Sequence, residues 1–172
     1  MIRWLSRSVV FTVAAMASVP ALAVQAAHPI DAMHYFVGHW ECAGRFPASG
    51  RRIASRIDFE TGLDGRALIK RHADMAPASY RAMEAWAYSP RAGQFQATVL
   101  DNGGGTRLMT SDGWHDRTLT WSVTDPAQPK QAFVYVRQDG NHFRLDWKIA
   151  PPGKRSMVVG DTLTCRRSGA AG

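Results

Sequence analysis

The chain has 172 residues, 45% hydrophobic and 20% charged, with two cysteines and a formal net charge of +7. This length fits one domain that buries about two thirds of the surface its unfolded chain exposes. The basic residues are dispersed and follow no aromatic-basic recognition motif, so we expect no nucleic-acid partner.

The chain begins with the pattern of an export signal. Arg3 and Arg7 form a short positive segment, and residues 9–19 are apolar apart from one threonine and one serine. Small residues predict cleavage after Ala23 or Ala26, which lowers the formal charge from +7 to +5 because two arginines are lost. The apolar run is shorter than the roughly 18–20 residues that span a bilayer. We therefore expect an exported, periplasmic or secreted protein with no integral membrane span.

Cys42 and Cys165 lie near the two ends of the mature chain. Neither has a nearby cysteine partner or a C-x-x-C spacing, and thiols are oxidised in the exported compartment. One structural disulfide is therefore expected, with two free buried thiols as the alternative. Such a bond requires the first and last elements of the domain to touch.

Short runs rich in Val, Ile, Thr and aromatic residues recur between turn signals about every ten residues, which is typical of an all-β domain. A helical turn capped by Asp31 and ending at Phe36 is expected before the first strand. The domain plan is a signal peptide (1–26), a β domain (27–167) and a flexible tail (168–172). The expected strands are 38–46, 51–60, 66–73, 82–89, 93–101, 106–114, 117–124, 131–138, 141–149 and 156–166.

Alternation within the strands gives each of them one apolar face. In the first strand Trp40, Cys42 and Phe46 oppose Glu41 and Arg45. About ten consecutive antiparallel strands exceed what a twisted open sheet holds, so we predict a closed up-and-down barrel whose seam the disulfide crosses. An immunoglobulin-like sandwich, whose disulfide also joins two strands, is the alternative architecture.

Residues 36–44 (FVGHWECAG) resemble the G-x-W opening strand of lipocalin-like (calycin) barrels. In those proteins the tryptophan follows a helical turn and packs across the base of the barrel, which implies that Trp40 is a structural plug. Over roughly residues 34–167 the chain also resembles an uncharacterised family, a domain of unknown function, of exported bacterial proteins of that superfamily. The segments that carry this second resemblance are 63–66 (LDGR), 85–90 (AWAYSP), 101–104 (DNGG) and 161–164 (DTLT).

Nitrobindin, a haem-binding relative, has a similar G-x-W opening. Such proteins hold the haem iron through a histidine near the C-terminal strand, whereas no histidine follows His142 in this chain. An axial ligand is needed, and only His39, His72, His115 or His142 could supply one within the barrel. We therefore expect no cofactor, haem included.

The sequence displays no catalytic or metal motif. His142 and Asp146 are four residues apart on one strand, roughly 13 Å along an extended chain, which is too far to chelate one metal ion. The glycine-rich segment 102–105 precedes a strand and so lacks the helix N-terminus of a phosphate loop. Neither G-x-S-x-G nor H-E-x-x-H occurs. Binding is thus favoured over catalysis.

A barrel of this kind either fills its interior with side chains or encloses a small ligand. We expect it to bind a small apolar or amphipathic molecule, and an inward arginine makes an anionic ligand an option, because arginine pairs with carboxylates. The alternatives are a barrel-pocket enzyme and a packed barrel that works through its outer surface, with the aromatics as core and the arginines at the surface. The candidate ligand-binding residues are Arg71, Trp86, Tyr88, Trp121, Tyr135, Arg137 and Trp147.

Overall fold

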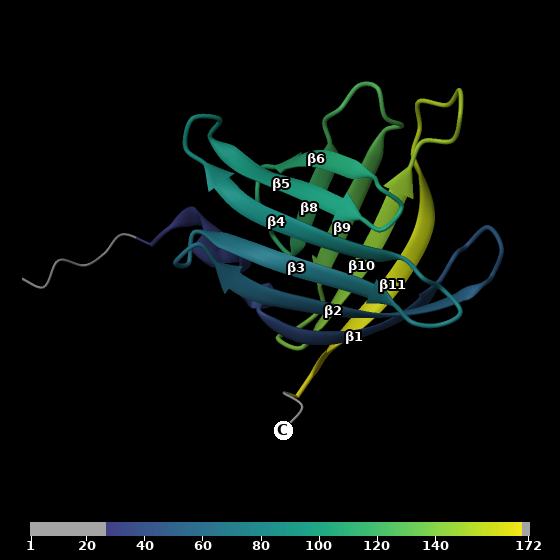
Figure 1. Cartoon of the computed structure of the whole chain (residues 1–172), viewed down its shortest axis with the longest axis horizontal. Helices are drawn as coiled ribbons and strands as arrows, with labels where there is room; N and C mark the ends of the chain where they lie inside the picture. The colour runs from purple at the N-terminus through teal and green to yellow at the C-terminus, as the bar shows by residue number, and fades with distance from the viewer. Residues whose placement is uncertain (1–26, 170–172) are drawn as a thin grey trace, which may run out of the picture.

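The turn-separated strands of the sequence pair with their chain neighbours in one antiparallel sheet (Figure 1). The computed structural model describes residues 27–169, so the expected signal peptide lies outside the described residues. A 3₁₀ helix, η1 (Pro29–Phe36), comes first. The strands are β1 (Gly38–Arg45), β2 (Arg52–Gly62), β3 (Ala67–Asp74), β4 (Arg81–Ser89), β5 (Gln94–Asp101), β6 (Thr106–Ser111), β7 (Trp114–His115), β8 (Thr118–Val123), β9 (Gln131–Arg137), β10 (His142–Ile149) and β11 (Val158–Ser168).

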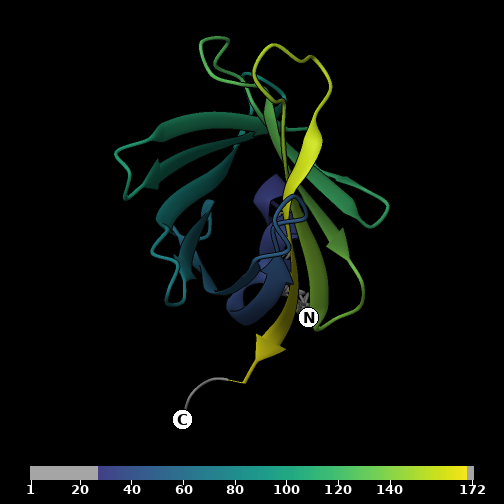
Figure 2. The same ribbon diagram turned by 90° about the vertical axis from the view of Figure 1, so that its right-hand side faces the viewer.

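The sheet closes on itself, as predicted, into a barrel of lipocalin-like type. Its strand order is β6-β5-β4-β3-β2-β1-β11-β10-β9-β8-β7, and a further pairing of β6 with β8 completes a ring of ten strands. Figure 2 shows these strands arranged around the purple N-terminal helix. Closure pairs backbone N–H and C=O groups that the edge strands of an open sheet would leave exposed.

Two details of the expected elements are wrong. The strand expected over residues 106–114 is interrupted before Trp114, because Gly113 has a positive φ of 95° and leaves β7 as a two-residue strand beyond the ring. The helix begins at Pro29 rather than behind an Asp31 cap. His28 is the cap, and the Asp31 carboxylate accepts a hydrogen bond from the His28 N–H at 2.8 Å. In addition, β11 continues through Ser168, the first residue of the expected tail.

The predicted disulfide joins Cys42 of β1 to Cys165 of β11, so the first and last strands do touch. The two cysteines are direct partners in a ladder that pairs His39–Arg45 with Thr162–Ser168. The narrowest junction of the ring lies elsewhere, since β6 and β8 share only the pairs Met109 with Val123 and Thr110 with Ser122. The disulfide therefore reinforces a long ladder rather than the weakest seam.

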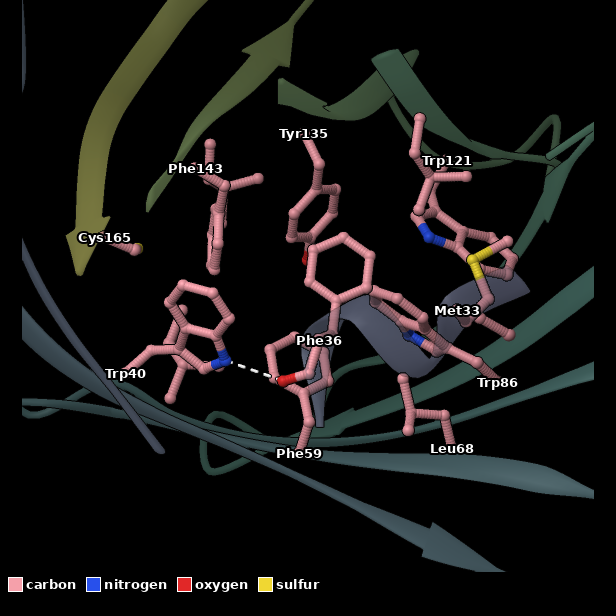
Figure 3. Packing of buried hydrophobic residues seen from close by; sticks show 14 of the residues in the cluster. Met33, Phe36, Trp40, Phe59, Leu68, Trp86, Trp121, Tyr135, Phe143 and Cys165 are labelled. Carbon is pink, nitrogen blue, oxygen red and sulfur yellow. Dashed lines mark hydrogen bonds between the residues drawn. The ribbon is translucent and has the colours of Figure 1, made fainter. Parts of the chain in front are cut away.

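Aromatic side chains fill the end of the barrel that η1 covers, which we call the closed end (Figure 3). The helix inserts Ile30, Met33 and Phe36, all fully buried, into the ring. The Phe36 ring lies 5.1 Å from the Phe59 ring and 5.5 Å from the Trp86 ring. Such rings bury large apolar areas, and their stacked and edge-to-face contacts add to that stabilisation.

The G-x-W segment fixes the helix to the first strand. The Trp40 indole N–H donates to the Phe36 carbonyl at 2.7 Å, and the Arg167 guanidinium lies over the indole, 4.3 Å from its centroid. Gly38 has a φ of 122°, and a Cβ there would lie 2.9 Å from an Arg167 nitrogen. Only glycine combines this conformation with this close approach. Trp40 is thus buried in the closed end, where the resemblance placed it.

Within residues 27–169 no helix is both long and apolar enough to cross a membrane.

Candidate functional site

A cavity of about 330 Å³ occupies the other end of the barrel, which we call the open end. The middle and later parts of β3 and β10 and the first parts of β2, β4, β6, β9 and β11 line it, together with Phe46 after β1 and Tyr80 before β4. One part of its wall is apolar and another part is charged. The lining residues are Phe46, Ile53, Lys70, His72, Asp74, Tyr80, Glu84, Arg107, Gln131, Phe133, Leu145, Trp147, Asp161 and Leu163.

The floor of the cavity is a buried ion pair. Lys70 of β3 and Glu84 of β4 are register partners, 1% and 5% exposed, and the Lys70 ammonium donates to Glu84 at 2.5 Å. The same ammonium donates to the Tyr135 hydroxyl at 2.9 Å, and the Trp86 indole N–H donates to the other Glu84 oxygen at 2.8 Å. Burial raises the pKa of Tyr135 well above its usual value, so its hydroxyl stays protonated. Each charge is hydrogen-bonded, as a buried pair requires.

A histidine and an aspartate stand above this pair on the same face of β3. His72 Nε2 lies 3.0 Å from Asp74 Oδ1, which also accepts from the Ser55 hydroxyl at 2.6 Å. Burial lowers the pKa of His72, so its ring is neutral near pH 7. Burial works to raise the pKa of Asp74, but the hydrogen bonds from His72 and Ser55 outweigh it and hold the pKa below its usual value. The ionised carboxylate only accepts, so Nε2 carries the proton.

An arginine closes the wall on the β6 side. The Arg107 guanidinium pairs with Asp101 at 2.9 Å and donates to the Tyr80 hydroxyl at 2.8 Å. Burial raises the pKa of Tyr80, which therefore remains neutral. The Arg107 Nε atom has no partner among the described residues, but it is itself buried from solvent.

On the opposite wall, Asp161 of β11 faces the cavity beside its register partner Trp147 of β10. Gly160 is an extra residue in β11 at this point, because the register shifts between Trp147 and Lys148. A Cβ on Gly160 would lie 2.5 Å from the Trp147 ring, so the indole packs directly on the backbone. Bulges of this kind turn side chains toward a site. Burial, and after it the charge of Asp74, raises the pKa of Asp161 to about 6.

Of the residues that the sequence suggested as ligand contacts, Trp147 lines this cavity. Its indole N–H donates to the Gln131 side chain at 3.1 Å. Trp86, Trp121 and Tyr135 are buried below the cavity in the aromatic core of the closed end. Tyr88 is half-buried and packs on Phe95 at 5.2 Å.

The two arginines suggested as ligand contacts lie away from the cavity. Arg71 is on the outer face, half exposed and paired with Glu60 at 2.6 Å. Arg137 stacks between the rings of Tyr35 and Trp114, 4.0 and 4.6 Å from their centroids, near the helix. Neither is placed to hold a carboxylate in this cavity.

Sequence reasoning missed most of the charged wall, although alternation carried a signal for part of it. Glu84 is two residues before Trp86, and Asp161 is two before Leu163, so each shares the inward face of an apolar neighbour. In β3 the signal was ambiguous. Residues 67–69 are apolar in succession, and the phase containing Arg71 was taken as inward, whereas Lys70, His72 and Asp74 occupy the interior.

The wall combines hydrogen-bonding groups with an apolar surface. Among residues 27–169 no group of three or more His, Cys, Asp or Glu side chains is arranged to hold a metal ion. The cavity volume lies at the lower end of the range for small-molecule sites, about 300–1,000 Å³, and its mixed wall is typical of them.

A closed ten-stranded antiparallel barrel with a helix at one end and a cavity at the other defines a lipocalin-like, calycin-type fold. Among solved structures, the S-type phycobiliprotein lyase CPES from Guillardia theta is similar, with a TM-score of 0.55 over 84% of this chain and 95% of that chain. The two are 9% identical in sequence, so the similarity shows the fold alone. No protein-family model and no curated protein sequence matches the chain.

Proposed function

We propose that this protein binds a small amphipathic molecule in the open-end cavity. The observation that carries the proposal is the division of the barrel interior: aromatic packing stops above Tyr135, and a cavity of about 330 Å³ follows. Phe46, Phe133 and Leu145 offer an apolar surface, and the charged wall faces it. A ligand with one polar and one apolar part matches such a wall, because its apolar part contacts the apolar side chains and its polar part can hydrogen-bond to the charged ones.

The cellular setting is part of this proposal. The signal-like N-terminus and the Cys42–Cys165 bond support an exported, periplasmic or secreted protein, since disulfides persist in oxidising compartments. We place it with the exported bacterial calycin proteins that its sequence resembles. Mass measurement of the protein purified from its own host tests this, because removal of residues 1–23 or 1–26 is expected. The full-length mass would contradict it.

The binding proposal is tested with a neutral amphiphile, 1-hexanol, titrated into the isotope-labelled protein while the indole N–H resonance of Trp147 is followed by NMR. A saturable shift is expected. Leu145→Trp fills the cavity and should abolish the shift. Leu108→Trp, the same substitution at a half-exposed outer position, should leave the shift unchanged. Ile53→Phe is a second cavity-filling variant in case Leu145→Trp does not fold. No saturable shift in the unaltered protein would contradict the proposal.

We further propose that the protein carries no haem. Of the four histidines considered as iron ligands, His72 lines the cavity, and its Nε2 is held by Asp74. His39 is paired with Asp58 and His142 with Asp139, both half exposed, and His115 is exposed in β7. Haem titration is expected to give no Soret band characteristic of a bound, ligated iron. Such a band, lost in His72→Ala, would establish a nitrobindin-like function instead.

A further inference from the structure

The basic groups of the cavity wall are already paired within the protein. Lys70 is bound by Glu84 and Tyr135, and Arg107 by Asp101 and Tyr80. His72 is neutral and donates to Asp74. The Arg107 Nε atom, which has no partner among the described residues, is buried from solvent. These groups therefore offer an anionic ligand no free cation.

The acidic groups differ from one another. Glu84 and Asp74 each accept hydrogen bonds from two side chains. Asp161 lines the same cavity, yet within residues 27–169 no side chain donates to its carboxylate. The backbone N–H of Trp147 and, after it, the charge of Lys70 favour the ionised form of Asp161. Asp161 is thus the carboxylate of the wall that is left for a ligand.

The neighbourhood of Asp161 also favours a positive charge. The Trp147 indole lies next to it, held in place by the Gly160 bulge and by its hydrogen bond to Gln131. The rings of Tyr80 and Phe133 line the same cavity, whereas the Phe46 ring, which also lines it, already carries the Arg51 guanidinium. The faces of aromatic rings attract cations, and a carboxylate beside them adds a charge-assisted hydrogen bond.

We propose that the occupant of this cavity is an amphipathic amine, whose ammonium group binds the Asp161 carboxylate beside the Trp147 ring and whose hydrocarbon part lies against Ile53, Phe133 and Leu145. This inference rests on the proposed function and names its ligand class. It replaces the anionic option raised by the sequence. Arg51 and Arg52 lie in a neighbouring hollow outside the cavity and are exposed, and the Arg51 guanidinium stacks on Phe46.

The titration of Asp161 gives the site a pH dependence. The charged and titratable groups that line the cavity with it are Lys70, His72 and Asp74 from β3, Tyr80 just before β4, Glu84 from β4, and Arg107 from β6. The charge of Asp146, on β10, also acts on Asp161. Burial, with the Asp74 charge next, places its pKa at about 6, so the carboxylate is ionised mainly above that pH. An alkyl ammonium stays charged to about pH 10. Its affinity should therefore rise about tenfold between pH 5 and pH 8, because the ionised fraction of Asp161 rises by about that factor.

The test compares three six-carbon probes by calorimetry on the full mature protein at pH 8: hexylammonium, 1-hexanol and hexanoate. We expect hexylammonium to bind most tightly and hexanoate most weakly. Asp161→Asn should weaken the binding of hexylammonium tenfold to a hundredfold, which is the range for a hydrogen bond to a charged group. It should also remove the pH dependence of that affinity. The same variant should leave the affinity for 1-hexanol unchanged. Glu41→Gln, an exposed carboxylate on the outer face, is the matched control and should change neither affinity.

The outcomes separate the two proposals. Tighter binding of hexanoate than of hexylammonium, or hexylammonium binding that Asp161→Asn does not weaken, would overturn the amine assignment while 1-hexanol binding upholds the proposed function. Failure of all three probes to bind the unaltered protein would overturn the proposed function, and the amine assignment with it.

Discussion

The two ends of this barrel are built from the same strands, yet they differ in what those strands turn inward. At the closed end the inward residues of the neighbouring strands β3 and β4 are Leu68 and Trp86, both fully buried. One step along the same strands the inward residues are Lys70 and Glu84, and beyond them lie His72 and the cavity. A single change of residue type along one face therefore divides a packed core from a polar site.

This difference shows how a small barrel can be both stable and open. Aromatic packing and the helix supply apolar burial at the closed end, which is the dominant stabilising term in folding. The open end buries less apolar surface, and its buried charges need hydrogen-bonded partners. The four predictions below test whether stability and binding are separated in this way, from the largest expected effect to the smallest.

Removing the disulfide should have the largest effect. The Cys42→Ala, Cys165→Ala double variant loses a cross-link between residues 123 apart in sequence. In the loop-entropy model, this costs up to about 4–5 kcal/mol of unfolding free energy. The ladder between β1 and β11 remains, so the barrel should still form and bind 1-hexanol. Urea unfolding measures the loss. Unchanged stability would show that the bond contributes nothing beyond the ladder.

Phe36→Ala tests the closed end. This fully buried ring packs against six aromatic neighbours: Tyr35, Phe59, Trp86, Trp114, Tyr135 and Phe143. Its removal leaves a cavity in the core and should cost about 3–5 kcal/mol in urea unfolding.

Phe46→Ala is the matched control at the open end, where the ring is half-buried and lines the cavity. It should lower the unfolding free energy by about 1 kcal/mol or less, because less apolar area is lost. It should, however, weaken the binding of 1-hexanol. Equal stability losses for the two phenylalanine variants would contradict the division between the ends.

Glu84→Gln tests the pair at the boundary. The substitution leaves the Lys70 charge buried without its counter-ion and should destabilise the protein by about 3 kcal/mol. Glu60→Gln removes the partner of Arg71 in an exposed pair on the outer face and should change stability by about 0.5 kcal/mol or less. Thermal unfolding of the two variants under identical conditions compares them. Similar melting temperatures would mean that the interior pair is as hydrated as the outer one.

Asp161→Asn should stabilise the protein slightly, and only at neutral or higher pH. Because burial raises the folded-state pKa of Asp161 from 3.8 to about 6, its contribution to stability is fully present below about pH 4 and lost as pH rises through 6. After allowance for partial exposure, the variant should be more stable than the unaltered protein by about 1–2 kcal/mol at pH 8. At pH 4 the two should be equal. Urea unfolding at both pH values measures this, and equal stability at pH 8 would contradict it.

Such a gain is expected where a residue is retained for binding rather than for stability. The comparison between the two ends would then extend to single residues: Phe36 would stabilise without binding, and Asp161 would serve binding at a cost in stability.

The strands and the closure of the barrel could be predicted from the sequence because they rest on local signals. Alternation over short runs and turn residues between them predicted the strands of the ten-stranded ring. The pairing of Cys42 with Cys165 was predicted from the expected export of the protein and from the places of the two residues in the first and last strands, and the structure contains this bond. The interruption before Trp114 was missed because it depends on the backbone conformation of Gly113.

The site could be predicted only in part. Trp147 was proposed from its aromatic character, and it lines the cavity. Arg71 was proposed from a period-2 pattern that fits either phase, because Ala67, Leu68 and Ile69 are all apolar. Shifting the phase by one residue exchanges the inward and outward sets, so Arg71 lies outside and Lys70 and His72 lie inside.

By itself, the sequence determined the all-β class, the number of strands in the ring, the disulfide and the burial of Trp40, since each depends on periodicity or on a short motif. Tertiary structure alone decided which phase of β3 faces inward and how far the aromatic packing extends from the closed end toward the open end. It also decided that, of the cavity carboxylates, Asp161 remains without a side-chain partner. These features depend on contacts across the barrel between side chains of strands that are distant in sequence, and a local sequence pattern does not predict such contacts.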